Sequence, residues 1–592
     1  MAQRTRVMMS GPGWVAGPVM LVVAVLVVAV LVLAASPLAR AQSAGVSDPL
    51  NGAAIEAIRV VVVNPGPDAA VADRVADSVR RSLALFPGAR FSKEAFDLQL
   101  ARARRTAEVG GLDYDVSLGS AGGVDVEVRV TLGDSAASRE GRGRLAGDPD
   151  AGSLLLDRNG TYIVGKFDAL GLYYANNNSW YGQPGPLLAG NPLVQGQPSG
   201  AGYRDWAEAY VHYGVYGITP LSKRVYLYGG LSGITAASSG DELFSSKTRT
   251  HTGVEDAYVG LVGGSTDASG NRLVYNLSAG RQKFTLANAF LIANTAANGH
   301  DRAALQANAR WAADNLVLAQ VAYNRLRLEA FHLDPDELPI LDSGTRLAGL
   351  NAEFRPSPDW MVAASYVQAT DGRAAYYGPT GTLVGVRKGL RVYDARFTYA
   401  PVESRQGPFG GAEIALQENA DFPMKARAGW AELGYRWPAT TWSPSLSYRY
   451  SYFSGDDPAT SAFERWDPLF SGGNGEQWVQ GANHFKVVQD SNVVAHRIQL
   501  RLKPDPRVEI VPQLWTFRAA EANNIGGNPA LSSLNSRDYG REANVTAKWF
   551  VSRKIYVHGH LAYTQPGDAV KRALPDKPDD WFSVLMFVRY AY

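Results

Sequence analysis

The sequence predicts an all-β transmembrane barrel of about 18 antiparallel strands, preceded by a small α+β domain. The composition is the first reason: the 592 residues include 28 Tyr, 13 Trp and 61 Gly. The second is that, from residue 154 onward, apolar residues occupy every second position of successive segments. The third is that no long apolar run follows residue 36. A barrel strand turns only alternate residues to lipid, so this pattern is typical of a membrane barrel rather than of membrane helices.

Residues 1–41 have the features of a secretory signal peptide. Two arginines precede an apolar stretch over residues 15–35, and Ala39 and Ala41 form a small-residue cleavage site. We expect cleavage before Gln42. The alternative is a retained N-terminal membrane anchor, because the apolar stretch is long for a signal peptide.

Residues 50–133 predict a small domain with the order β-α-α-β-β. Its strands are expected near 55–63, 112–118 and 124–132, and its helices over 71–86 and from Ser92 onward. The element order, the segment from Phe91 to Leu100 and the closing hairpin resemble a POTRA domain, a periplasmic module found before many outer-membrane barrels. The resemblance implies binding of a periplasmic partner or guidance of cargo, with sheet edges free for strand addition. A generic small α+β domain is the alternative.

A flexible linker is expected over 134–153, which is rich in Gly and in charged residues, and the barrel over 154–592. Connections after even-numbered strands are mostly tight, as at Ala312 to Asp314, Pro356 to Pro358, Pro504 to Pro506 and Ser552-Arg553, and those after odd-numbered strands are mostly long. Short periplasmic turns and long outer loops are typical of a bacterial outer-membrane barrel. The eighteen strands are expected near 160–174, 203–217, 222–236, 252–264, 272–285, 303–313, 315–330, 344–355, 358–370, 388–402, 408–418, 425–438, 442–454, 493–504, 506–518, 537–550, 553–565 and 580–592.

The last predicted strand ends in aromatic residues. Phe582, Tyr590 and Tyr592 share one face with three apolar residues, whereas Ser583 and Arg589 lie on the other. A final strand with a terminal aromatic resembles the signal by which barrel proteins are recognised for outer-membrane assembly. The barrel-assembly machinery and outer-membrane lipid are therefore expected partners.

A barrel of this width leaves an aqueous channel unless something fills it, and the long Gly-, Asn-, Pro- and Asp-bearing loops are suited to folding inward as constrictions. Taking the polar face of each strand as inward gives two sets of lumen charges. They either form an arginine ladder that attracts carboxylates, above all at Arg497 and Arg501, or neutralise one another across neighbouring strands. The basic set is Arg310, Arg355, Arg396, Arg449, Arg497, Arg501 and Lys548, and the acidic set is Glu353, Asp394, Glu413, Glu432, Glu509 and Glu542.

No sequence feature supports enzymatic chemistry or a cofactor. The chain has no Cys, which excludes disulfides, thiolate metal sites and a cysteine nucleophile. His558 and His560 share a strand face, but no third ligand is evident, so a solvated lumen pair is expected rather than a metal site. No esterase elbow, zinc-protease motif or P-loop is present. The net charge of +2 gives no indication of nucleic-acid binding.

Two stretches resemble the alginate export family of outer-membrane channels. That family implies an eighteen-stranded barrel whose arginine-rich constriction passes an anionic polysaccharide, and Arg281, Arg449 and Arg465 are the motif arginines in this chain. The chain departs from the family in its POTRA-like domain and its nearly balanced lumen. The stretches are Ala279-Gly280-Arg281-Gln282-Lys283-Phe284, and the strand from Tyr448 through Ser454-Gly455-Asp456-Asp457-Pro458 with the following segment Phe463 to Phe470, in which Trp466 stands in place of Phe or Tyr.

The resulting hypothesis is an outer-membrane channel of alginate-export type that passes an anionic polysaccharide or another hydrophilic solute. The alternative is a protein-translocating or barrel-assembly pore of the Omp85 or two-partner-secretion kind, which the POTRA-like domain favours. That superfamily usually has sixteen strands and a Val/Leu-Arg-Gly-Tyr/Phe tip motif, and this sequence lacks the motif.

Overall fold

The computed structural model describes residues 55–591, with gaps. The longest gaps are 84–90, 133–153, 180–201, 472–480 and 523–535. The predicted signal peptide, the predicted linker and Tyr592 therefore lie outside the described residues.

The N-terminal unit is a three-stranded sheet with helical segments. Its strands are β1 (Ile55–Val62), β2 (Val109–Leu118) and β3 (Val124–Leu132), in the order β1-β3-β2, and its described helix is α2 (Ala69–Ser82). β1 runs parallel to β3, and β2 runs antiparallel to it. Phe96, Leu100 and Ala103 are helical and almost fully buried, as their predicted helical spacing requires. β1, α2, β2 and β3 overlap the predicted strands and first helix, whereas most of the second predicted helix, from Ser92 onward, lies outside the described residues.

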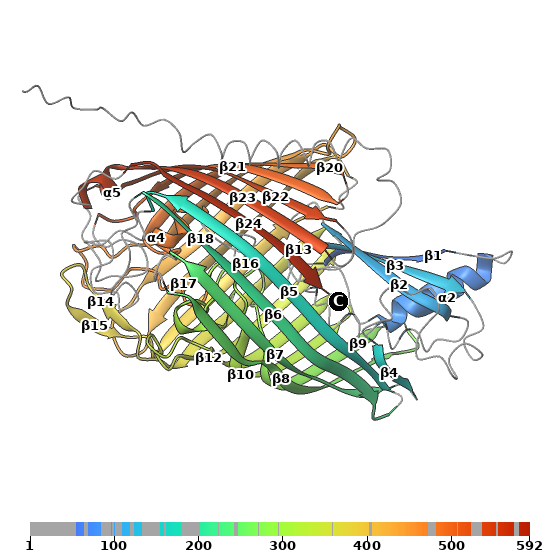
Figure 1. Cartoon of the computed structure of the whole chain (residues 1–592). Coiled ribbons are helices and arrows are strands. Elements are labelled where there is room, and N and C mark those ends of the chain that lie inside the picture. Colours follow the sequence, from blue (N-terminus) through green and yellow to red (C-terminus); the bar gives the residue numbers. More distant parts are fainter. Residues whose placement is uncertain are drawn as a thin grey trace, which may run out of the picture. The chain divides into compact units, whose positions relative to one another are not determined.

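Eighteen antiparallel strands close into a barrel, as predicted, because the last strand pairs with the first. The colours of Figure 1 follow this circuit from teal β5 through green and yellow to red β24, which lies beside β5 again. The strands are β5 (Thr161–Asn177), β6 (Tyr203–Pro220), β7 (Val225–Gly240), β8 (Arg249–Thr266), β9 (Arg272–Lys283), β10 (Ala312–Tyr323), β11 (Leu326–Asp334), β12 (Arg346–Ser357), β13 (Trp360–Asp371), β16 (Leu390–Tyr399), β17 (Gly407–Asn419), β18 (Ala426–Arg436), β19 (Ser445–Phe453), β20 (Val493–Asp505), β21 (Val508–Arg518), β22 (Asp538–Phe550), β23 (Ile555–Pro566) and β24 (Trp581–Ala591).

The long and short connections alternate, so the barrel has a long-loop end and a short-turn end. The small elements α4, α5, β14 and β15 all lie at the long-loop end (Figure 1). A short strand, β4, pairs with the beginning of β5. Among the described residues no helix is both long enough and apolar enough to cross a membrane. These elements are β4 (Leu154–Arg158), η6 (His300–Arg302), β14 (Ala375–Tyr377), β15 (Leu383–Val386), α4 (Phe485–Val488) and α5 (Asp568–Ala573).

The predicted sixth strand, 303–313, is wrong, and so is the tight turn predicted at Ala312 to Asp314. Most of that segment belongs to the long loop between β9 and β10, and β10 begins only at its end. The turn lies instead at Asn324-Arg325, where Asn324 has a φ of 51°. It divides the predicted strand 315–330 into the end of β10 and the start of β11. Asn adopts the left-handed region more readily than most residues, which makes this position suited to a two-residue turn.

Candidate functional site

The inner wall of the barrel changes character along its strands. On β19 the buried, inward residues run from Ser447 through Arg449 to Phe453, whereas Tyr448 and Tyr450 are 47% and 38% exposed on the outer face. Neighbouring strands repeat the change from polar to apolar toward the long-loop end. The apolar inward residues there are Phe331, Leu333, Leu347, Val367, Ala369, Leu390, Val392, Ala415, Ala426, Ala428, Phe453, Val493, Ala495 and Phe517.

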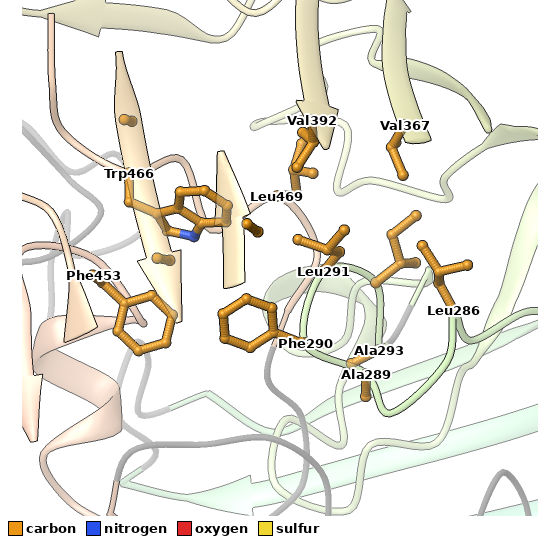
Figure 2. Close-up of a cluster of buried hydrophobic side chains, with 14 of the residues drawn as sticks. Leu286, Ala289, Phe290, Leu291, Ala293, Val367, Val392, Phe453, Trp466 and Leu469 are labelled. Atoms are coloured by element: carbon orange, nitrogen blue, oxygen red, sulfur yellow. The ribbon is translucent and has the colours of Figure 1, made fainter. Parts of the chain in front are cut away.

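Two long loops pack against this apolar part of the wall. We call residues 284–293, 463–471 and 481–492 the loop plug. The Phe290 ring lies 5.6 Å from that of Phe453 and 6.2 Å from that of Trp466. Figure 2 shows Phe290 beside these two rings, with Leu291 near Leu469 and the strand residue Val392. The two loops also pair directly, through a β-bridge between Ile292 and Phe470. The lumen is thus filled by packed loops toward its long-loop end.

Wall carboxylates hold the loop between β9 and β10 by its backbone. Glu208 accepts hydrogen bonds from the backbone N–H groups of Gln306 (2.8 Å) and Ala307 (2.6 Å). Glu255 likewise accepts from Trp311 (2.6 Å) and Ala312 (3.0 Å). A loop so bound cannot offer these N–H groups to a neighbouring strand, which is the physical reason for the failed strand prediction.

Glu542 performs the same task for the loop between β19 and β20. Its carboxylate accepts backbone N–H bonds from Ala482 (2.6 Å), Asn483 (3.0 Å) and His484 (3.0 Å). The His484 ring stacks on Phe517 at 4.2 Å. Glu542 was predicted to line the lumen as a free acidic charge, but the structure uses it to anchor a loop.

Asp336, in the loop between β11 and β12, is a meeting point of three arginines. Arg302 and Arg310 each approach its carboxylate to 2.7 Å, and Arg281 also binds it. Burial alone would raise the pKa of Asp336, but Arg281 and the other two arginines outweigh burial and hold the pKa below its usual range. The cluster fastens the loop between β9 and β10 to the loop between β11 and β12.

Asp467, inside the loop plug, is a second meeting point. Arg387 binds its carboxylate with two nitrogens (2.8 and 3.0 Å), and the Tyr376 hydroxyl donates to it at 2.6 Å. Burial would raise the pKa of Asp467, but the paired Arg387 outweighs burial and lowers it. Arg387 and Tyr376 belong to the connection between β13 and β16, so a third loop is tied to the plug.

Below the plug lies a belt of charged inward residues, which we call the charged ring. Over β11 to β17 each of its two arginines is paired with a carboxylate. Arg396 binds Asp394 and donates to Ser365 at 2.7 Å, and Arg327 approaches Glu329 to 3.0 Å. Both arginines of this part are thus paired, but its four carboxylates, Glu329, Glu353, Asp394 and Glu413, outnumber them. The charged ring comprises Arg327, Glu329, Glu353, Asp394, Arg396, Glu413, Glu432, Arg449, Arg497, Arg501, Glu509 and Lys548.

Over β18 to β22 the ring carries an excess of positive charge. We call Arg449, Arg497, Arg501 and Lys548 the basic sector. Arg449 stands directly across from Arg497 in the strand register, and both guanidinium groups lie over Trp515, at 5.4 and 5.7 Å. The carboxylates facing this sector are Glu432, 2.6 Å from Arg497, and Glu509, 3.5 Å from Arg501 and 3.6 Å from Lys548. Four cations therefore share two carboxylates.

The other predicted basic residues fall into three places. Arg355 is half-buried on β12, near the short-turn end. Arg281 and Arg310 are in the Asp336 cluster rather than on a bare lumen wall. Arg465 is buried in the loop plug, where burial lowers its pKa to about 10 against the pull of Asp456. Of the family-motif arginines, only Arg449 faces the lumen from the middle of a strand.

Sequence reasoning missed the residues that fasten the loops. Arg302, Arg387, Asp336 and Asp467 all lie in connections, for which no strand alternation assigns a face. The detectable signal was the apolar run around Phe290, Leu291 and Ile292 inside a predicted outer loop, since an exposed loop has no use for such a run.

Two polar clusters in the lumen wall contain histidine, which can serve in catalysis or in metal binding. His212 Nε2 lies 2.8 Å from Ser232 Oγ, which in turn donates to Asp256 at 2.8 Å. Asp256 approaches the same Nε2 edge, at 3.5 Å, instead of orienting the ring through Nδ1, so the trio lacks the geometry of a nucleophile–base relay. Among the described residues no three metal-ligating side chains gather, and His558 and His560 engage Phe587 and Thr546 instead.

The chain is similar to one protein family and to several solved structures. A family model described as "Alginate export" matches residues 241–583. No curated protein matches the chain.

Similar solved structures include three bacterial ones. They are OccK7 (OpdD) of Pseudomonas aeruginosa (12% identity, TM-score 0.41, 73% of this chain and 98% of that one), OccAB1 of Acinetobacter baumannii (10%, 0.43, 72% and 96%) and OprD of Pseudomonas aeruginosa (12%, 0.41, 72% and 95%). All three TM-scores are below 0.5, so these likenesses carry nothing further about this chain.

Proposed function

The chain belongs to the alginate export family, and on that premise we propose that its cargo is an anionic polysaccharide that passes the basic sector of the charged ring. It is an outer-membrane β-barrel channel of alginate-export type. Its long-loop end is accordingly the extracellular end.

The observation that carries the cargo proposal is the basic sector. Arg449 and Arg497 face each other across neighbouring strands. Arg501 lies on the same face of β20, four residues further along. Planar guanidinium groups bind carboxylates bidentately, and a row of them offers successive sites to a polymer with one carboxylate per sugar. Weak, repeated sites of this kind let a polymer bind and still move on.

Passage requires the loop plug to move. Glu542 of the wall holds the plug by its backbone, and Asp467 of the plug is tied to Arg387 in the connection between β13 and β16. A polyuronate carries the same chemical group in many copies, so it can compete for the arginines and backbone N–H groups that hold the loops. We therefore propose that the polysaccharide opens the loop plug by replacing the protein carboxylates with its own.

The N-terminal unit is proposed as a periplasmic, POTRA-like domain. Its sheet has β1 and β2 at its edges, and both edges are open to an added strand among the described residues. We propose that it docks a periplasmic component of the export route, after removal of residues 1–41 and on the linker 134–153. Phe582, Tyr590 and Tyr592 are proposed as the signal read by the barrel-assembly machinery.

Conductance in planar bilayers tests the proposal. Polyuronate should block the anion current of the wild-type channel at low concentration, whereas a neutral polymer of equal length should not. A channel that conducts but ignores polyuronate would contradict the cargo, and a silent barrel under all conditions would contradict the channel. Deletion of 50–133 should leave conductance intact while stopping secretion. The protein-translocating alternative is not favoured, because the barrel has eighteen strands, and no catalytic role is proposed.

A further inference from the structure

Four basic side chains stand on the outer surface of the barrel near its extracellular end. Arg518 follows the inward residue Phe517, and Arg541 precedes the inward Glu542, so both arginines point outward. Lys425 and Arg427 flank the inward Ala426 and therefore also point outward, and all four side chains are exposed. We call this set the outer basic patch: Lys425, Arg427, Arg518 and Arg541.

The patch lies at the depth of lipid headgroups. Arg427 sits over the Tyr452 ring at 5.9 Å, and it is two residues nearer the strand end than Gly429, the partner of Tyr452. Arg541 is likewise two residues nearer the end than Ala543, the partner of Tyr563. Outward tyrosines mark the interfacial aromatic belt of a barrel. The cations therefore stand just beyond that belt.

The patch is not neutralised by the protein. Among the described residues no carboxylate lies within ion-pair distance of its four cations. Asp538, across from Arg518 in the register, is the one outward acid beside them, and Glu521 is engaged by Arg537 at 2.6 Å. Two other exposed arginines at this end have acidic partners.

Two examples show that contrast. Arg346 on β12 lies 3.1 Å from Asp334, and Arg391 on β16 lies 3.7 Å from Glu418. Four exposed basic residues without an ion pair thus lie along β18–β22 among the described residues. A concentration of unpaired cations at headgroup depth needs an anionic counterpart outside the chain, because like charges on neighbouring strands repel.

We propose that the outer basic patch binds the phosphate groups of anionic lipids in the outer leaflet. Guanidinium groups match phosphate geometry, and the exposed apolar wall below, including Leu514 at 59%, receives the acyl chains. The site is on the outside of the barrel, so it is independent of the proposed cargo path. Its effect is to hold a lipid annulus against β18–β22, the strands that carry the basic sector on their inner face.

Native mass spectrometry of the full-length protein in non-ionic detergent tests this site. The probes are a diphosphorylated lipid A and the same lipid without phosphates. We expect the wild type to retain only the phosphorylated lipid. Arg427→Gln, Arg518→Gln and Arg541→Gln should each weaken retention about fivefold, equivalent to about 1 kcal/mol per charge.

The matched control is Arg346→Gln, which removes an outward arginine already paired with Asp334. It should retain the lipid as the wild type does. The triple variant combines Arg427→Gln, Arg518→Gln and Arg541→Gln. If it retains the phosphorylated lipid as well as the wild type does, or if the wild type retains the phosphate-free lipid equally well, the proposal is overturned. Conductance and polyuronate block should be unchanged in the triple variant, so a failure of the lipid site and a failure of the cargo path give different results. Heat stability of the detergent-solubilised triple variant confirms that it folds.

Discussion

The same strands build two different environments inside the barrel. On β19, Phe453 packs against the loop plug, and Arg449, four residues away, belongs to the charged ring. The apolar part is held by close packing of Phe290 and Trp466, which closes the lumen. The charged part is held by ion pairs, which leave a local excess of positive charge. The comparison teaches that the packing that fills the lumen and the excess of positive charge lie at separate levels of one wall, so each can be altered alone.

The largest effect is expected from loosening the apolar level. Phe290→Ala with Leu291→Ala removes buried packing worth about 2 to 5 kcal/mol per residue. The plug should then open readily, and mean conductance in planar bilayers should rise at least severalfold. Leu433→Ala, at a position 69% exposed on the outer wall, is the control and should conduct as the wild type does. An unchanged conductance in the double variant would show that the plug does not close the channel.

The next effect concerns the charged level. Arg449→Gln with Arg497→Gln removes two lumen cations, each worth about 1 kcal/mol to a passing ion at close range in water. The anion-to-cation permeability ratio should fall about fivefold per charge while conductance changes little. Arg325→Gln with Arg405→Gln removes two exposed cations at the short-turn end and should leave reversal potentials in place. If both double variants behave alike, selectivity does not come from the basic sector.

Asp467→Asn tests the tie between the loop plug and the connection from β13 to β16. Breaking a buried pair of this kind costs about 3 to 5 kcal/mol. Hydrogen exchange at residues 463–471 should accelerate by about a hundredfold or more, and Asp457→Asn, at a half-buried turn position, should have little effect. Because the pKa of Asp467 is depressed in the folded protein, its contribution is present above the unfolded pKa, near 3.9, and is lost as pH falls below it. Protection that persists equally at pH 3 and pH 6 would count against the ion pair.

The smallest effect is expected at Lys486 in α4. Burial lowers its pKa to about 8, with Glu542 opposing the shift. The unfolded segment then binds more protons than the folded one between pH 8 and the unfolded pKa near 10.4, so local stability should rise with pH across that window. After solvent screening the gain is about 1 kcal/mol. Hydrogen exchange of 482–488, corrected for intrinsic rates, should show it in the wild type and not in Lys486→Met.

Strand alternation was enough to predict the barrel, because lipid outside and a polar lumen inside act on every second residue. It predicted that Arg449 and Arg497 face the lumen, and both side chains are buried in the structure. It failed at 303–313, where Glu208 and Glu255, distant in sequence, take the backbone N–H groups that a strand would use. Long-range capture of this kind leaves no local pattern.

The loop plug was predicted only in outline. Long loops suited to folding inward were expected from their Gly, Asn, Pro and Asp content, but their apolar anchors were not identified. The convergence of Arg281, Arg302 and Arg310 on Asp336 depends on three separate loop paths. Residue spacing cannot specify which acid such arginines share, because a loop has no fixed period.

The seam between β24 and β5 joins the two ends of the barrel sequence. Arg589 donates to Asp168 at 2.7 Å, across 421 positions of the chain. All other neighbouring barrel strands are also consecutive in sequence. The pairing of β24 with β5 is therefore the one that can form only after every strand is in place. The cost in chain entropy of bringing such distant residues together makes closure the slow and late step of assembly. An unfinished barrel would expose both edge strands, and the Asp168–Arg589 pair marks the moment at which that exposure ends.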